Sequence, residues 1–186
     1  MRKYQYYYDY VFRVDDFLTQ QECRKFIDLG EATGFGQAPV NTAEGVSVRT
    51  SIRSNSRALL DDVATSDELW GRVQPWVPSP FRGREAIGLN ERFRYYRYDV
   101  GQAFAAHFDQ AYVRETGEQS CFTFLVYLND DFEGGATRFF QPEEFDVKPQ
   151  AGSLLLFFHP QLHAGLEVLS GIKYVLRSDV MYQPDN

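Results

Sequence analysis

His107 and Asp109 lie two positions apart in the segment GQAFAAHFDQ, and both side chains are of types that bind metal ions. Side chains two residues apart in an extended segment point to the same side, so one ion could contact both. Two histidines and one carboxylate on one face of an ion leave three positions open, which suits Fe(II) that must also bind O2 and an organic cosubstrate. The sequence therefore predicts an iron site that needs one further histidine from a distant strand.

The chain contains two other histidines, His159 and His163, both in the segment FFHPQLHAGLEV. His159 ends an apolar run and directly precedes Pro160, which indicates a structural residue beside a loop. His163 begins a new run after this turn and lies ten residues before Lys173. We therefore predict that His163 is the third ligand.

A cationic side chain is expected near this site on the strand that follows. Lys173, Val175 and Arg177 alternate in KYVLRSDVMY and so share one face of the expected strand. A cation there could bind the far carboxylate of a dicarboxylic cosubstrate, as a point charge for lysine or as a bidentate pair for arginine. Three roles remain open for Arg177, namely sharing this anchor, contacting the substrate, or pairing with Asp179.

The elements that must position these residues are mostly strands. From Gly88 onward, short β-rich runs are separated by turn signals, a spacing typical of an all-β sandwich or barrel. These runs are LNERFRYYRYDV, CFTFLVYLND, ATRFF, SLLLFF and KYVLRSDVMY. Helical patterns precede them, so the sequence predicts an α+β, mainly β fold with N-terminal helices packed on one sheet.

The N-terminal part is expected to contain a strand in YQYYYDYVF, two helices and a long loop. Thr19 and Glu22 form a capping box for the first helix, Phe26, Ile27 and Leu29 give it an apolar stripe, and Gly34 ends it. The segment SDELWGRVQPW predicts a second short helix, with Trp70 and Trp76 in the core. Residues 37–57 are polar and irregular and predict a loop, with residues 35–55 covering a binding pocket.

Composition limits the class of protein. The formal net charge of −7 and the lack of a basic stripe argue against nucleic-acid binding. No run approaches the length of a membrane span, and the N-terminus lacks the apolar core of a signal peptide. Cys23 and Cys121 lie far apart in the sequence and show no disulfide pattern, so we expect them to be reduced thiols. We expect one domain, residues 1–186, in the cytoplasm.

These residues together resemble the 2-oxoglutarate/Fe(II) dioxygenases, and among them the prolyl 4-hydroxylase-like branch. His163 follows the His-x-Asp pair by 54 residues (163 − 109 = 54), and Lys173 follows ten residues later. The resemblance covers roughly residues 88–182, with a weaker similarity in RSNSR. Its other segments are RYDVGQAFAAHFD, TFLVYLNDDFEGGATRFF and VKPQAGSLLLFFH.

The resemblance implies a double-stranded β-helix, or jelly roll, over residues 88–182, supported by helices in residues 1–87. It implies Fe(II) bound by His107, Asp109 and His163, and 2-oxoglutarate bound through Lys173. The remaining predicted cosubstrate residues are Tyr98, Tyr127 and Arg177. The glycines Gly134 and Gly135 would allow a sharp turn beside the site.

The implied activity is hydroxylation of an unactivated C–H bond with 2-oxoglutarate and O2, which releases succinate and CO2. Ascorbate is a candidate reductant. The substrate would be a peptidyl residue, an amino acid or a small metabolite. A non-catalytic jelly-roll module that senses a metal or 2-oxoglutarate is the alternative. Nucleic-acid demethylation is chemically close, but the acidic charge counts against it.

The substrate side departs from the prolyl hydroxylase pattern. Ser120 stands where an arginine is usual, Met181 where a histidine is usual, and Arg177 where a small residue is usual. These differences argue against peptidyl proline as the substrate. The residues of RSNSR, namely Arg53, Asn55 and Arg57, are candidates for the pocket entrance.

Overall fold

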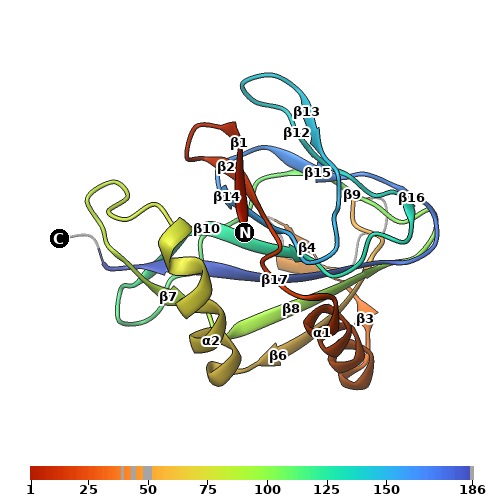
Figure 1. Cartoon of the computed structure of the whole chain (residues 1–186), viewed down its shortest axis with the longest axis horizontal. Coiled ribbons are helices and arrows are strands. Elements are labelled where there is room, and N and C mark those ends of the chain that lie inside the picture. Colours follow the sequence, from red (N-terminus) through yellow and green to blue (C-terminus); the bar gives the residue numbers. More distant parts are fainter. Residues whose placement is uncertain (39, 43–44, 48–51, 185–186) are drawn as a thin grey trace.

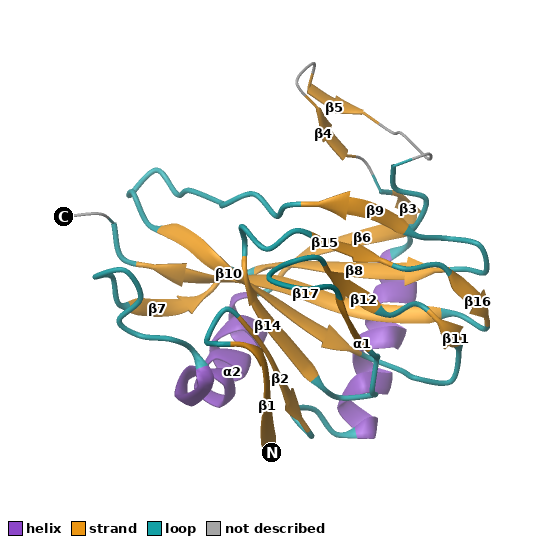
Figure 2. Ribbon diagram, turned by 90° about the horizontal axis from the view of Figure 1, so that it is seen from above, coloured by secondary structure: helices purple, strands orange, loops and turns teal. Residues whose placement is uncertain are grey.

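The computed structural model describes residues 1–38, 40–42, 45–47 and 52–184. Two antiparallel sheets face each other, and two helices cover the outer face of the larger sheet (Figure 1). The turned view shows both helices on the same side of this sheet (Figure 2). None of the helices in the described residues is long and apolar enough to cross a bilayer.

The larger sheet is nine-stranded within the described residues and runs in the order β1-β2-β14-β10-β17-β8-β6-β3, with β7 paired to β17. Its strands are β1 (Arg2–Tyr7), β2 (Val11–Asp15), β3 (Gly36–Gln37), β6 (Ser56–Asp61), β7 (Ala86–Leu89), β8 (Arg92–Tyr98), β10 (Gln119–Tyr127), β14 (Leu154–Phe158) and β17 (Lys173–Tyr182).

The smaller sheet has the order β13-β12-β15-β9. Its strands are β9 (Phe104–His107), β12 (Thr137–Phe139), β13 (Phe145–Val147) and β15 (His163–Gly165). Two further pairs are β4 (Val40–Thr42) with β5 (Gly45–Ser47), and β11 (Glu133–Gly134) with β16 (Val168–Ser170).

Each face of the larger sheet is covered by its own hydrophobic core. Leu155 and Val175 belong to the core between the two sheets, whereas Leu156 and Leu176 belong to the core beneath the helices. Successive side chains of a strand point to opposite faces, so a strand buried on both faces must be apolar throughout. This explains the unbroken apolar run of β14, in which every residue is buried.

The first helix, α1 (Gln20–Thr33), begins and ends where the sequence predicts. Thr19 and Glu22 form the capping box, and Gly34 ends the helix with a φ of 88°. The predicted apolar stripe is only partly right, because Leu29 is 37% exposed and Cys23 and Gly30 are the buried positions. A Cβ at Gly30 would lie 3.1 Å from Tyr95, so this glycine lets the helix approach the sheet closely.

The second helix, α2 (Val63–Val73), begins earlier than predicted because Asp62 caps it through Thr65. A 3-10 turn, Gln74–Trp76, follows it. Trp70 and Trp76 are partly buried against the core rather than enclosed by it.

The segment expected to be one long loop contains strands. Strands β3, β4 and β5 and the start of β6 lie within residues 36–57, and the β4–β5 pair projects from the body of the protein (Figure 2). The expected pocket cover at residues 35–55 falls partly outside the described residues. Strands β1, β2 and β6 belong to the larger sheet, so the N-terminal half supplies more than helical support.

Candidate metal and cosubstrate site

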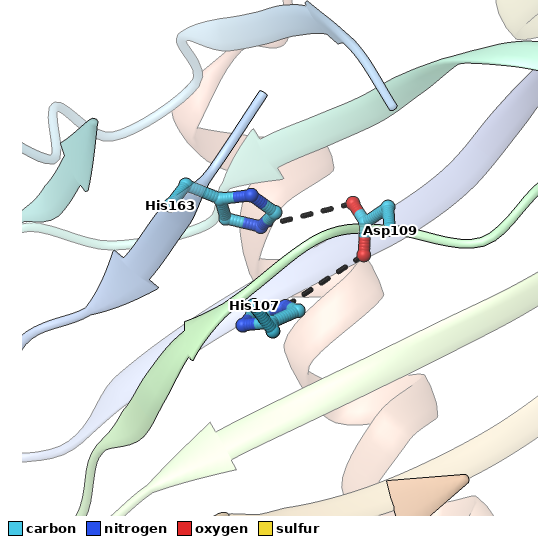
Figure 3. A group of neighbouring side chains, drawn as sticks. All are labelled: His107, Asp109 and His163. Atoms are coloured by element: carbon cyan, nitrogen blue, oxygen red, sulfur yellow. Dashed lines mark ion pairs between the residues drawn. The ribbon is translucent and has the colours of Figure 1, made fainter. Parts of the chain in front are cut away.

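Three predicted ligands meet between the two sheets. His107 ends β9, Asp109 follows two residues later, and His163 begins β15 (Figure 3). His107 and His163 are partners in the antiparallel register of β9 and β15, so their side chains lie on the same face. One ligand atom from each of the three residues lies within 4.8 Å of the other two.

The histidine rings are oriented by the backbone. The Nδ1 atom of His107 lies 2.8 Å from the carbonyl oxygen of Ala105, and that of His163 lies 2.9 Å from the carbonyl oxygen of Gln161. Donation from Nδ1–H to these carbonyls leaves the Nε2 lone pairs available. Each Nε2 lies 3.7 Å from an oxygen of Asp109, so both rings face the carboxylate.

The protonation states suit a divalent metal ion. Burial and the neighbouring His163 together lower the pKa of His107 to about 3, and burial lowers the pKa of His163 as well. Burial would raise the pKa of Asp109, but Arg177 and the two histidines outweigh this effect and lower it. Neutral histidines and an ionised carboxylate are the forms that bind metal ions.

Asp109 is held from behind by a chain of hydrogen bonds. The Thr123 hydroxyl donates to Asp109 Oδ2 at 2.6 Å and lies 3.0 Å from His159 Nδ1. Ser120 Oγ lies 2.9 Å from the other ring nitrogen of His159. His159 is therefore buried behind the carboxylate and does not belong to the ligand cluster, which agrees with its predicted structural role. The sequence reading missed Thr123, although a hydroxyl residue inside an apolar strand run is a usable signal.

The mutation Thr123→Val should lower affinity for divalent metal ions without removing the site. The valine keeps the volume of threonine but leaves Asp109 and His159 without their shared partner. Loss of such an outer-shell hydrogen bond typically costs about 10–100-fold in metal affinity. Anaerobic titration with Co(II), followed by its visible absorption, measures the change. Thr116→Val, at an exposed position, is the matched control. Equal affinities for the Thr123→Val variant and the unmodified chain would contradict this role for Thr123.

The triad opens into a cavity that contains Lys173. The cavity lining includes the three ligands, Lys173, Val175 and Arg177, so the predicted shared face of β17 is present. The Lys173 side chain is 3% exposed and its ammonium donates to the carbonyl oxygen of Gly135 at 2.6 Å. Burial lowers the pKa of Lys173 to about 7. A buried amine with no carboxylate partner among the described residues is suited to receive one from a ligand.

The two predicted tyrosines lie beside this lysine. The Lys173 ammonium is 4.9 Å from the ring centroid of Tyr98 and 5.6 Å from that of Tyr127. Tyr98 lines the cavity. The Tyr127 hydroxyl lies 2.7 Å from Thr137 Oγ1, and of these two residues only Thr137 is part of the cavity lining. A ligand carboxylate at Lys173 would therefore meet Thr137 as well, a residue that the sequence reading did not select.

The mutation Gly135→Ala should displace Lys173 and destabilise the fold. Gly135 has a φ of 63°, and a Cβ there would lie 2.9 Å from the Phe132 ring and 3.1 Å from Lys173 Cδ. Strained left-handed backbone of this kind costs on the order of 1–3 kcal/mol. Thermal unfolding should show a lower Tm, and affinity for 2-oxoglutarate should fall with it.

Gly71→Ala provides the matched control for Gly135→Ala. Gly71 lies inside α2, and a Cβ there meets nothing within 4 Å. Alanine is preferred over glycine in a helix interior by about 1 kcal/mol, so Gly71→Ala should raise the Tm. An unchanged Tm for Gly135→Ala would contradict the steric argument.

Arg177 shows one of the three roles left open by the sequence, the pairing with Asp179, and makes a second contact that was not predicted. Its Nη2 atom lies 3.0 Å from Asp109 Oδ1 and 3.3 Å from Asp179 Oδ1. Its Nη1 atom donates to the Tyr96 hydroxyl at 3.4 Å. Arg177 therefore pairs with Asp179 and also lies directly beside the metal-binding carboxylate.

Arg53 of the RSNSR segment packs against the same cavity wall. The Arg53 guanidinium lies 4.4 Å from the ring centroids of both Tyr96 and Phe104, and these two rings line the cavity. Asn55 accepts from Arg53 Nε at 2.7 Å. Burial raises the pKa of Tyr96, but Arg53, Arg177 and Arg94 outweigh it, and the pKa falls to about 8.

Ser120 and Met181, which differ from the prolyl hydroxylase pattern, are also neighbours in the structure. Ser120 and Met181 are register partners on β10 and β17, and both are buried. Ser120 binds His159 instead of facing a ligand. Neither position is therefore part of the cavity lining, whereas Arg177 is.

The donor set fits Fe(II). Two neutral imidazole nitrogens and one carboxylate, gathered on one side of an open cavity, match the facial arrangement of non-haem Fe(II) oxygenases. Within the described residues this is the cluster of three such ligands that lies close enough to hold one ion.

The comparisons with known proteins agree with this site. The model of the 2OG-Fe(II) oxygenase superfamily matches residues 93–178, which include His107, Asp109, His163, Lys173 and Arg177. Probable prolyl 4-hydroxylase 7 from Arabidopsis thaliana is 26% identical over 197 residues, covering 88% of this chain and 60% of that protein. Prolyl 4-hydroxylase 1 from the same plant is 27% identical over 187 residues, covering 86% of this chain and 64% of that protein. The chain thus spans somewhat under two thirds of the length of these relatives.

Solved structures confirm the jelly-roll fold. The viral collagen prolyl hydroxylase from Paramecium Bursaria Chlorella virus-1, in its 2OG complex, superposes with a TM-score of 0.64 at 21% identity, covering 92% of this chain and 95% of that one. A prolyl-4-hydroxylase from Pseudomonas putida gives a TM-score of 0.66 at 18% identity, covering 95% and 93%. With the ligand cluster and the family match over residues 93–178, this fold makes the chain similar to the 2OG-Fe(II) oxygenase superfamily, and within it to the prolyl 4-hydroxylases.

Proposed function

We propose that this chain is a hydroxylase that uses Fe(II), 2-oxoglutarate and O2 to hydroxylate an unactivated C–H bond, releasing succinate and CO2. The substrate class is a peptidyl residue, an amino acid or a small metabolite. The observation that carries the proposal is the presence of the His107–Asp109–His163 cluster and a buried, carboxylate-free Lys173 in one cavity.

The protein residues have separable tasks in this reaction. His107, Asp109 and His163 would hold the iron, which when bound supplies the oxidation chemistry with O2. Thr123 and His159 keep the Asp109 carboxylate oriented toward the ligand cluster.

Lys173 binds the far carboxylate of 2-oxoglutarate as a point charge, with Thr137 beside it. The wall formed by Phe157, Leu125 and Val175 is apolar and excludes water from the reacting groups.

The first test measures cosubstrate binding. Purified protein with Mn(II) should be stabilised by 2-oxoglutarate and much less by glutarate, which lacks the keto oxygen needed to chelate the metal. Succinate formation with Fe(II), ascorbate and a substrate panel then measures turnover. If 2-oxoglutarate binds no better with the metal than without it, the proposed activity is wrong. Metal-dependent binding with no O2 consumption across the panel would favour the sensor alternative.

Two expectations about the setting of the reaction also stand as proposals. We propose ascorbate as a reductant that maintains Fe(II), and a cytoplasmic location. The two cysteines, Cys23 and Cys121, are buried and form no disulfide, which supports a reducing compartment. Fractionation of cells that express the tagged chain would test the location.

A further inference from the structure

Four arginines gather on the cavity side of the larger sheet, beside the metal ligands. Arg94 and Arg177 are register partners on β8 and β17, and Arg57 is the register partner of Tyr96. Residues directly opposite in neighbouring strands share a face, so these side chains lie on the same side as Tyr96. Arg53 completes the group, since its guanidinium lies on the ring of Tyr96.

This arginine cluster (Arg53, Arg57, Arg94 and Arg177) carries more positive charge than its surroundings balance. Among the described residues, its carboxylate partners are Asp109, which pairs with Arg177, and Asp179, which pairs with Arg94 and Arg177. One of these two carboxylates is also a predicted metal ligand, so a bound divalent ion would increase the excess further. The whole chain has a formal net charge of −7, so the local excess is opposite in sign to the protein.

The hydroxyl of Tyr96 reports the same positive potential. Burial raises the pKa of Tyr98 to about 12 and dominates there, whereas at Tyr96 the arginines reverse the effect of burial. A buried excess of charge is costly unless a ligand of opposite charge compensates it. The cluster therefore has the electrostatics of an anion site.

Donor atoms remain available in this cluster. Arg53 Nη2 and Arg177 Nε are buried and have no hydrogen-bond partner in the structure. Arg53 is 6% exposed, and its guanidinium is fixed between the rings of Tyr96 and Phe104. Phe104 in turn stacks on the ring of His107 with centroids 3.6 Å apart. An anion bound here would therefore lie next to the metal site.

This anion site is separate from the predicted anchor of 2-oxoglutarate. Lys173 and Arg177 are four residues apart on the same face of β17, which separates their Cα atoms by roughly 13 Å. A five-carbon diacid with its far carboxylate at Lys173 and its other end at the triad reaches Arg177 only beside Asp109. Arg53, which bonds to Asn55 and stacks on Tyr96 and Phe104, keeps its unpaired Nη2 for another molecule.

We propose that Arg53 and Arg177 bind a carboxylate of the substrate, and that the substrate is a free amino acid or another small carboxylic acid. This inference rests on the proposed hydroxylase function and names its substrate class. It also accounts for the departures from prolyl hydroxylases, because a residue inside a peptide offers no free α-carboxylate to the two guanidinium groups.

The test uses the Mn(II)- and 2-oxoglutarate-loaded protein and pairs of small molecules that differ only in charge. The probes are the free L-amino acids and short hydroxy acids, each beside its primary amide, and binding is measured by thermal shift and calorimetry. At least one acid should bind about tenfold or more tightly than its amide, because charged hydrogen bonds to arginine contribute more than about 1.4 kcal/mol. Acids that bind are then assayed for substrate-dependent succinate formation with Fe(II).

Variants assign the effect to the cluster. Arg53→Met should weaken binding of the acid about tenfold or more and leave amide binding unchanged, and Arg177→Met should weaken binding of the acid at least as much. Arg97→Met is the matched control, since Arg97 lies on the same strand β8 but pairs with Asp99 on the opposite face. Arg53 contacts no predicted ligand in the structure, so its variant decides the question even if Arg177→Met also loses Mn(II).

The possible failures are distinguishable. Absence of stabilisation by Mn(II) with 2-oxoglutarate would overturn the proposed function itself. Two results would overturn the carboxylate proposal alone, provided that 2-oxoglutarate binds normally. One is that none of the acids binds, and the other is that acids and their amides bind equally well. An Arg53→Met protein that still prefers the acid over its amide as strongly as the unmodified chain would also overturn the carboxylate proposal.

Discussion

Replacing His163 with alanine should abolish metal-dependent 2-oxoglutarate turnover, whereas replacing His159 should only reduce it. His163 Nε2 faces the Asp109 carboxylate at 3.7 Å, while both ring nitrogens of His159 are engaged by Ser120 and Thr123. Loss of a ligand should exceed the loss of about 10–100-fold in metal affinity that is typical for outer-shell partners. Anaerobic Co(II) titration and succinate formation measure both effects.

The two histidine variants control each other because they remove the same side chain from neighbouring positions in one segment. Both histidines are buried, so the Tm of each variant should be recorded to separate folding from binding. The ligand assignment is wrong if the His159→Ala protein no longer binds Co(II) while the His163→Ala protein does.

Replacing Lys173 with methionine should abolish tight 2-oxoglutarate binding and yet raise the stability of the ligand-free protein. Truncating one partner of a buried charge pair costs about 2–5 kcal/mol in binding, which weakens 2-oxoglutarate affinity by at least about 30-fold. The free protein gains because methionine carries no charge that must be buried. Calorimetry with Mn(II) and thermal unfolding measure the two effects.

The pH dependence of this variant has a definite sign. The pKa of Lys173 is about 7 in the folded protein, below the value of about 10.4 for an exposed lysine. Between these values the unfolded chain binds more protons, so the lysine's destabilising contribution is largest below pH 7 and shrinks as the pH rises. The Tm gain of Lys173→Met should therefore be larger at pH 6 than at pH 9.

Binding of 2-oxoglutarate should respond to pH in the opposite way. The ligand carboxylate favours the protonated amine, so the affinity of the unmodified chain should fall as the pH rises above about 7. Lys148→Met, at an exposed position, is the control and should change neither the Tm nor the affinity. A Tm gain that is the same at pH 6 and pH 9 would contradict the buried-charge explanation.

The metal site could be predicted from the sequence because its ligands are residue types that are rare in this chain and occur at characteristic spacings. Only three histidines occur, and alternation along β17 means that Lys173 and Arg177 share a face. The capping box of α1 was equally local and was equally predictable. These features depend on residues close in the chain.

The features that were missed depend on contacts between distant strands. Thr123 supports Asp109 only because β10 passes behind the segment that follows β9. The arginine cluster joins β6, β8 and β17 with the RSNSR segment, and the register of these strands cannot be read from any one of them. The strands within residues 36–57 were missed because they are too short and polar to show alternation.

The position of β9 in the smaller sheet has a consequence for the metal-free protein. β9 is the last strand of that sheet; its register with β15 includes two residue pairs, and its other edge is bonded to residues 52–54. A metal ion would join the end of β9 to the start of β15 and so fasten the end of this short strand. We expect amide hydrogen exchange in residues 104–109 to slow when Mn(II) is added, more than in β10 at the centre of the larger sheet. The same ion that takes part in the chemistry would then also hold two strands of the smaller sheet together.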